Sequence, residues 1–185
     1  MKPLLVIEDI SPPMRRDLFT IVGVRVQATR YAWLALPNWI AVGVSLALLS
    51  ENGKATSEVL VTGLFLGGFL YLANVTHSLG HVVAGWVVHS PMDILLLTAT
   101  RDVTLYLKDR TAYPPSTRIR RSLGGPIANL VVGLAGLAMT SFVRSAWLEL
   151  FVLSNVGVGL WTLCPVPTMD GWVIWSSLLR KRHTR

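Results

Sequence analysis

The stretch VLVTGLFLGGFLYLANVTHSLGHVVAGWVV (residues 59–88) decides the fold of this chain. It carries no Asp, Glu, Lys or Arg, and about twenty apolar residues at a rise of 1.5 Å each suffice to span the roughly 30 Å hydrocarbon core of a bilayer. The stretch is longer than one span requires, and it contains His77 and His81 past its middle. It therefore predicts a membrane-spanning helix at about residues 58–88 with two imidazoles inside it.

Composition places the rest of the chain in the same class. The 185 residues are 52% hydrophobic, with a mean hydropathy of +0.52, which predicts one integral membrane domain over residues 1–185. The formal net charge of +7 does not indicate a nucleic-acid partner, because the basic residues lie between and beside the apolar segments. The single cysteine, Cys164, excludes an internal disulfide and a multi-cysteine metal cluster.

Three further apolar segments resemble membrane spans. They lie at about residues 31–50, 122–143 and 146–179, and the last is broken at 165–167 by two prolines. Between the second and third spans, residues 93–98 and 102–107 have the partly alternating pattern of a β-hairpin. The sequence thus predicts an all-α membrane protein with about four transmembrane helices and a small β element at the cytoplasmic interface.

The distribution of Lys and Arg predicts the orientation of these spans. With four spans, fifteen of the seventeen basic residues fall on the side that holds both termini and the 90–121 loop. Because basic loops remain in the cytoplasm, we expect both termini to be cytoplasmic and the membrane to be the plasma membrane of a prokaryote.

The two histidines and one later carboxylate predict a metal site. Histidines at i and i+4 share a helix face, and Asp170, beside the proline break, supplies a third ligand and leaves a fourth position for water. A charged carboxylate in apolar surroundings needs a cation, a hydrogen-bond network or a proton. The alternative is a polar cluster without metal. Cys164 is either a fourth ligand or a small packing residue.

Three motifs, in matching order, resemble those of the site-2 protease family, the intramembrane zinc metalloproteases that cut substrate helices within the bilayer. His77-Ser78-Leu79-Gly80-His81 resembles the family's H-E-L-G-H. The segment Gly125-Pro126-Ile127-Ala128-Asn129 is similar to A-G-P-x-A-N, and residues 164–171 (CPVPTMDG) are similar to N-L-L-P-x-P-P-L-D-G. Residues 21–26 before the first span resemble the family's N-terminal strand.

This resemblance implies that His77, His81 and Asp170 bind Zn²⁺ and that Asn129 helps to hold substrate or an oxyanion. It also marks departures, at Thr162, Thr168, Met169 and above all Ser78. In the family, glutamate at the position of Ser78 is the general base that accepts a proton from the attacking water. A serine hydroxyl cannot take over this role. Glu58 and Glu149 lie too far along their helices to replace the base.

The missing glutamate leaves three hypotheses open. The leading one is a site-2-protease-like protein that keeps zinc, has impaired catalysis, and binds transmembrane helices or partner proteins as a pseudoprotease. The second is an active intramembrane metalloendopeptidase that uses another base. The third is a membrane scaffold in which the histidines and aspartate hold no metal. The sequence therefore leaves open whether the chain is an enzyme.

Overall fold

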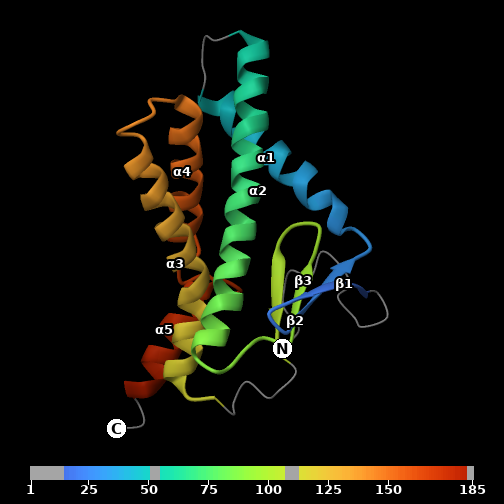
Figure 1. Cartoon of the computed structure of the whole chain (residues 1–185), viewed down its shortest axis with the longest axis vertical. Coiled ribbons are helices and arrows are strands. Elements are labelled where there is room, and N and C mark those ends of the chain that lie inside the picture. The colour runs from blue at the N-terminus through green and yellow to red at the C-terminus, as the bar shows by residue number, and fades with distance from the viewer. Residues whose placement is uncertain (1–14, 51–54, 107–112, 183–185) are drawn as a thin grey trace.

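The computed structural model describes residues 15–50, 55–106 and 113–182. The helices form an elongated bundle, and a small sheet lies beside the C-terminal half of α2 (Figure 1). The elements follow in the order β1 (Arg15–Ile21), β2 (Val24–Thr29), η2 (Ala32–Leu34), α1 (Ala35–Ser50), α2 (Thr56–Val87), β3 (Ile94–Leu97), β4 (Asp102–Leu105), α3 (Pro115–Met139), α4 (Ala146–Trp161) and α5 (Asp170–Arg182). The predicted class, a helical membrane protein with a small β element, is confirmed.

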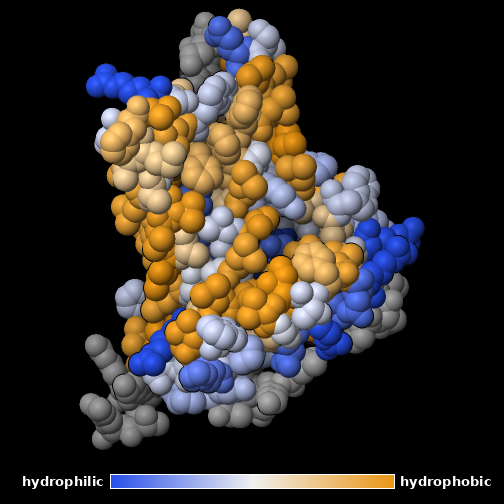
Figure 2. Space-filling view, viewed as in Figure 1, coloured by the Kyte–Doolittle hydropathy of each residue, from blue (hydrophilic) through white to orange (hydrophobic). Residues whose placement is uncertain are grey.

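Three helical segments are long and apolar enough to cross a bilayer: residues 32–50, 56–87 and 115–139. Within the most apolar 18 residues of each segment, only 11%, 22% and 28% respectively are buried inside the molecule. Most of these side chains therefore face outward. Figure 2 shows the result, a hydrophobic surface over the helices and hydrophilic residues near the outer part of the sheet. A surface of this kind is stable in lipid and not in water, so the chain is an integral membrane protein.

The expected fourth span is divided into two helices. α4 is apolar but only 16 residues long, and the chain then turns until α5 begins at Asp170. The break therefore covers residues 162–169 and is longer than the expected 165–167. Two prolines that cannot donate to a helix, together with Thr168 at φ 81°, account for its length. α3 begins at Pro115, before the expected residue 122, because proline suits the first position of a helix.

The sheet has the strand order β1-β2-β3-β4. β1 and β2 form an antiparallel hairpin, β3 and β4 form a second one, and the two hairpins join through parallel pairing of β2 with β3. α1 and α2 make the connection between β2 and β3. Side chains of the sheet pack on α2 at Val82, where a buried cluster also includes Val24, Val26, Met92 and Leu95. This core places the second hairpin beside the helix that carries both histidines.

Glycines allow α2 to approach its neighbours at backbone distance. A Cβ added to Gly67 would lie 2.9 Å from the backbone nitrogen of Ile40 in α1, and one added to Gly124 in α3 would lie 2.5 Å from the carbonyl oxygen of Gly80. Small residues at helix crossings in membranes have this effect because association there depends on close van der Waals packing. The α2–α3 crossing lies within the histidine motif itself.

Candidate metal centre

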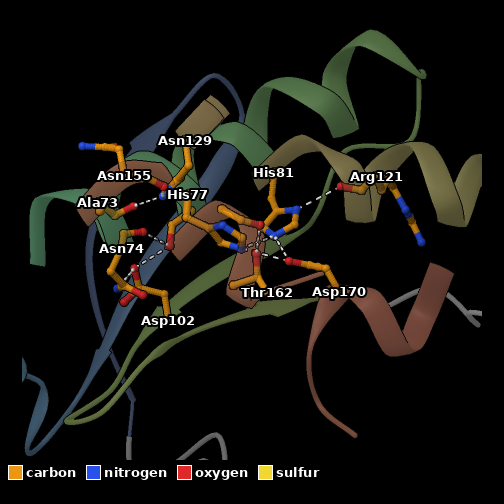
Figure 3. Close-up of polar contacts among 12 residues, drawn as sticks. Ala73, Asn74, His77, His81, Asp102, Arg121, Asn129, Asn155, Thr162 and Asp170 are labelled. Carbon is orange, nitrogen blue, oxygen red and sulfur yellow. Dashed lines mark hydrogen bonds and ion pairs between the residues drawn. The ribbon is translucent and has the colours of Figure 1, made fainter. Parts of the chain in front are cut away.

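His77, His81 and Asp170 converge on one point, although α5 lies far from α2 in sequence. His77 Nε2 lies 2.9 Å from Asp170 Oδ2, His81 Nε2 lies 3.2 Å from the same oxygen, and the two Nε2 atoms are 3.1 Å apart. Figure 3 shows the two rings and the carboxylate directed toward one another. His81 is buried and the other two are half-buried. Within the part of the chain that the structure describes, Cys164 does not belong to this cluster.

His77 Nε2, His81 Nε2 and Asp170 Oδ2 share too few hydrogens for every pair of them to form a hydrogen bond when both rings are neutral. His81 Nδ1 lies 2.9 Å from the backbone carbonyl oxygen of Arg121, and because a carbonyl only accepts, Nδ1 carries the hydrogen. In the neutral ring, Nε2 is then a bare lone pair that faces an ionised carboxylate, itself an acceptor. His77 can contribute at most one N–H. One N–H cannot satisfy all three contacts, so the arrangement favours a cation between the three atoms, either a second proton or a metal ion.

The donor set fits zinc. Two imidazole nitrogens and one carboxylate oxygen with a fourth position for water are typical of catalytic zinc sites. At zinc–ligand bonds of 2.0–2.1 Å, the edges of a tetrahedron measure about 3.3 Å, close to the three separations in this cluster. The three ligands therefore need little movement to hold the ion.

Arg121 fixes the orientation of His81 from the first turns of α3. Its buried guanidinium stacks on Tyr106 at 3.9 Å and on Tyr113 at 4.9 Å, and Nη1 donates to Ser90 Oγ at 2.9 Å. These contacts hold the backbone whose carbonyl accepts from His81. A partner on the second ring nitrogen sets the tautomer and direction of a ligating histidine. The sequence indicated Arg121 only as a topology signal.

The proline break delivers Asp170 to the cluster. Asp170 is the first residue of α5, and the next residue, Gly171, donates its N–H to the carbonyl oxygen of Thr162 at 2.9 Å. A Cβ at Gly171 would collide with the carbonyl oxygens of Leu163 and Cys164. Glycine after the aspartate is therefore required for the closed turn that directs the carboxylate toward α2.

Gly125 of α3 packs against the ring of His77. A Cβ at this position would lie 2.5 Å from both Cε1 and Nε2. We expect Gly125→Ala to displace the ring and weaken zinc binding about 10- to 100-fold, the range found when groups that position a ligand are changed. Zinc affinity is measured by chelator competition, with Gly157→Ala as the control because its Cβ would meet nothing within 4 Å. Equal affinity in the two variants would contradict this role for Gly125.

Ser78 has a carboxylate as a neighbour. Its Oγ lies 2.6 Å from Oδ2 of Asp102, the first residue of β4, and 3.0 Å from the backbone carbonyl oxygen of Asn74. Asn74 Nδ2 donates to the same Asp102 oxygen at 3.3 Å. Burial raises the pKa of the Asp102 carboxyl, and the bond from Ser78 and the nearby His77 partly oppose this shift.

Asn129 lies fully buried between three helices. Its Nδ2 donates to the carbonyl oxygen of Ala73 at 3.1 Å and lies 3.5 Å from that of Asn155 in α4 (Figure 3). Ala73 is one turn before His77 on α2. In this geometry the amide links α2, α3 and α4 and so positions the histidine helix. Its expected contact with substrate remains a prediction.

A comparison with solved structures identifies a matching architecture. The site-2 protease from Methanocaldococcus jannaschii aligns with a TM-score of 0.61 at 20% sequence identity, over 90% of this chain and 72% of that chain. The chain has the fold of a site-2 protease. No protein-family model matches its sequence, and a search of curated proteins finds no match.

The sequence predicted that His77, His81 and Asp170 come together, as the structure shows, but it did not point to Asp102. Glu58 and Glu149, the two carboxylates it considered and rejected, line a cleft between the start of α2 and α4, away from the histidines. Asp102 lay in the expected hairpin, and its approach to Ser78 requires knowing which helix that hairpin packs on. The available signal was an acidic residue at the start of a strand, β4, whose partner strand, β3, is entirely apolar.

Proposed function

We propose that this protein is a zinc-dependent endopeptidase of the site-2 protease type that cuts transmembrane helices within the bilayer. The observation that carries the proposal is the proton-poor cluster of His77, His81 and Asp170, which favours a bound cation and has separations suited to zinc. The likeness of fold to a site-2 protease supports the same conclusion.

In this proposal the ligands are His77 Nε2, His81 Nε2 and Asp170 Oδ2. When bound, zinc lowers the pKa of water to about 7 and polarises the carbonyl of the peptide bond to be cut. The residues of the chain supply orientation: the Arg121 carbonyl holds His81, Gly171 permits the turn at Asp170, and Asn129 joins the three central helices. The His77 and Asp170 side chains are only 12% and 16% exposed, which limits the bulk water around them.

A noncatalytic role is the second candidate, and Ser78 is the observation that favours it. Without a proton acceptor at this site, a zinc peptidase loses about 10²- to 10⁴-fold in rate. The protein would then bind a transmembrane helix or partner protein and release it uncut. The carboxylate of Asp102 at Ser78 favours the active enzyme over this alternative.

Metal content and helix cleavage together test the proposal. Zinc is counted by mass spectrometry on detergent-purified protein, with His77→Ala as the control, and we expect about one ion per chain that the control lacks. Cleavage is followed on single-span reporter helices in proteoliposomes, some with an Asn-Pro pair near the middle to loosen the helix. Bound zinc without cleavage of any reporter would favour the noncatalytic role, and absence of zinc would refute the peptidase and favour a metal-free membrane scaffold.

We also infer that the sheet and the 90–121 loop face the cytoplasm of a prokaryotic cell, because the basic residues concentrate there. In a Cys164→Ser background, Thr100→Cys in the hairpin turn should react with a membrane-impermeant maleimide only after cells are opened. Ser141→Cys, at the exposed end of α3, should react in intact cells and is the matched control. The reverse pattern of labelling would show that the sheet and the 90–121 loop face the outside of the cell.

A further inference from the structure

Asp102 brings a carboxylate to the residue position at which the family resemblance implies a catalytic one. Its Oδ2 lies 2.6 Å from the hydroxyl oxygen of Ser78, the residue that follows ligand His77. The serine side chain carries no charge of its own, and the aspartate of β4 brings a carboxylate within hydrogen-bond distance of it. The negative charge thus comes from the neighbouring strand and not from the helix.

The hairpin holds this carboxylate firmly. Asp102 pairs with Leu97 in β3, directly after the turn. In that turn Thr98 Oγ1 donates to the carbonyl oxygen of Arg101 at 2.6 Å, and Asn38 of α1 donates to the carbonyl oxygen of Ala99 at 2.7 Å. The turn is therefore bonded internally and tied to α1, so Asp102 approaches α2 at a defined position.

The contacts of Asp102 suit both of its protonation states. As a carboxylate, it accepts from Ser78 and from Asn74 Nδ2. A hydroxyl has one proton, so when Ser78 donates to the Asn74 carbonyl instead, the contact between Ser78 and Asp102 needs a proton on Asp102. Either state keeps a hydrogen bond between the two side chains. A group that gains and loses a proton when a single neighbouring hydroxyl turns is suited to proton transfer.

We propose that Asp102 is the general base of this protein, a catalytic carboxylate moved from α2 to β4, with Ser78 as the residue that positions it. This inference rests on the proposed peptidase function. The Asp102 carboxylate accepts a proton from water as the water oxygen bonds to the carbonyl carbon of the substrate. The carbon–nitrogen bond then breaks, the leaving amine takes the proton, and Asp102 returns to its ionised form.

Four variants test the assignment: Asp102→Asn, Ser78→Glu, their combination, and Asp17→Asn as the control. Asp17 lies in β1 at the opposite edge of the sheet and, like Asp102, accepts from an amide side chain, that of Gln27 at 2.7 Å. Each variant is assayed for zinc content, thermal midpoint in detergent and cleavage of the reporter helices. The first two measurements do not depend on activity.

Asp102→Asn should cut 10²- to 10⁴-fold more slowly and keep its zinc and thermal midpoint. The double variant, with glutamate back on the helix and the strand carboxylate neutralised, should regain cleavage. Ser78→Glu alone places two carboxylates together, and their repulsion should lower the thermal midpoint by about 2–4 °C for each kcal/mol. The midpoint should recover in the double variant, which has only one of these carboxylates. Asp17→Asn should match the parent throughout.

The outcomes separate this inference from the proposed function. A parent that cuts and an Asp102→Asn variant that cuts equally well would overturn the role of Asp102 and leave the peptidase intact. Loss of zinc or a large fall of the midpoint in Asp102→Asn would make Asp102 a structural residue and also overturn the role. A parent that binds zinc and cuts nothing, beside a double variant that cuts, would refute both proposals.

Discussion

Asp170→Ala is expected to abolish zinc binding at working concentrations while leaving the helical fold in place. Changes to groups that only position a ligand cost about 10- to 100-fold in affinity, and loss of a direct ligand should exceed this range. Asp170 also supplies the only negative charge of the cluster among the described residues. Without it, two neutral imidazoles remain, and they offer no charge to compensate a divalent cation in apolar surroundings.

Zinc stoichiometry after exhaustive washing measures this effect, and circular dichroism checks the helices. The matched control is Glu149→Ala, a carboxylate in the first turn of α4 that lies outside the cluster. Asp170→Asn provides a second variant of equal size that keeps the turn at Gly171 while removing the charge. Full zinc content in both Asp170 variants would show that the metal, if present, is held elsewhere.

Gly124→Val is expected to separate α2 from α3 and to destabilise the protein by at least the about 1–3 kcal/mol typical of overpacked cores. A Cβ there would meet the side chain of Ala84 and lie 2.5 Å from the carbonyl oxygen of Gly80. Backbone atoms cannot rotate away as a side chain can, so the helices themselves must move. His81 and the Arg121 carbonyl lie on the two separated helices, and their 2.9 Å hydrogen bond should break. Zinc affinity should therefore fall with stability.

The matched control is Gly68→Val, which places the same residue on α2 where nothing lies within 4 Å. It carries the same cost of a β-branched residue in a helix, so the difference between the two variants reports the crossing alone. The thermal midpoint in detergent and the zinc content are measured for both. Equal midpoints would mean that α2 and α3 are not packed at backbone distance.

The parts of the site that lie within one helix followed from the sequence. His77 and His81 face the same side because the α-helix has 3.6 residues per turn, and this holds wherever the helix packs. The apolar length of 59–88 likewise fixed a spanning helix without reference to its neighbours. The prolines near Asp170 indicated a break, although not its full extent to residues 162–169. These inferences needed only short-range geometry.

The carboxylate beside Ser78 could not be found in this way. Asp102 reaches it because β3 pairs in parallel with β2 and because Val82 packs against the sheet. Both are contacts between segments far apart in the sequence, and a local sequence pattern does not predict them. Arg121 is similar, since its role depends on stacking against Tyr106 and Tyr113. The sequence alone determined the apolar helices, the paired histidines and the break, which depend on periodicity and hydropathy. Only the tertiary structure brought Asp170 to the histidines and Asp102 to Ser78, because packing between distant segments decides which side chains meet.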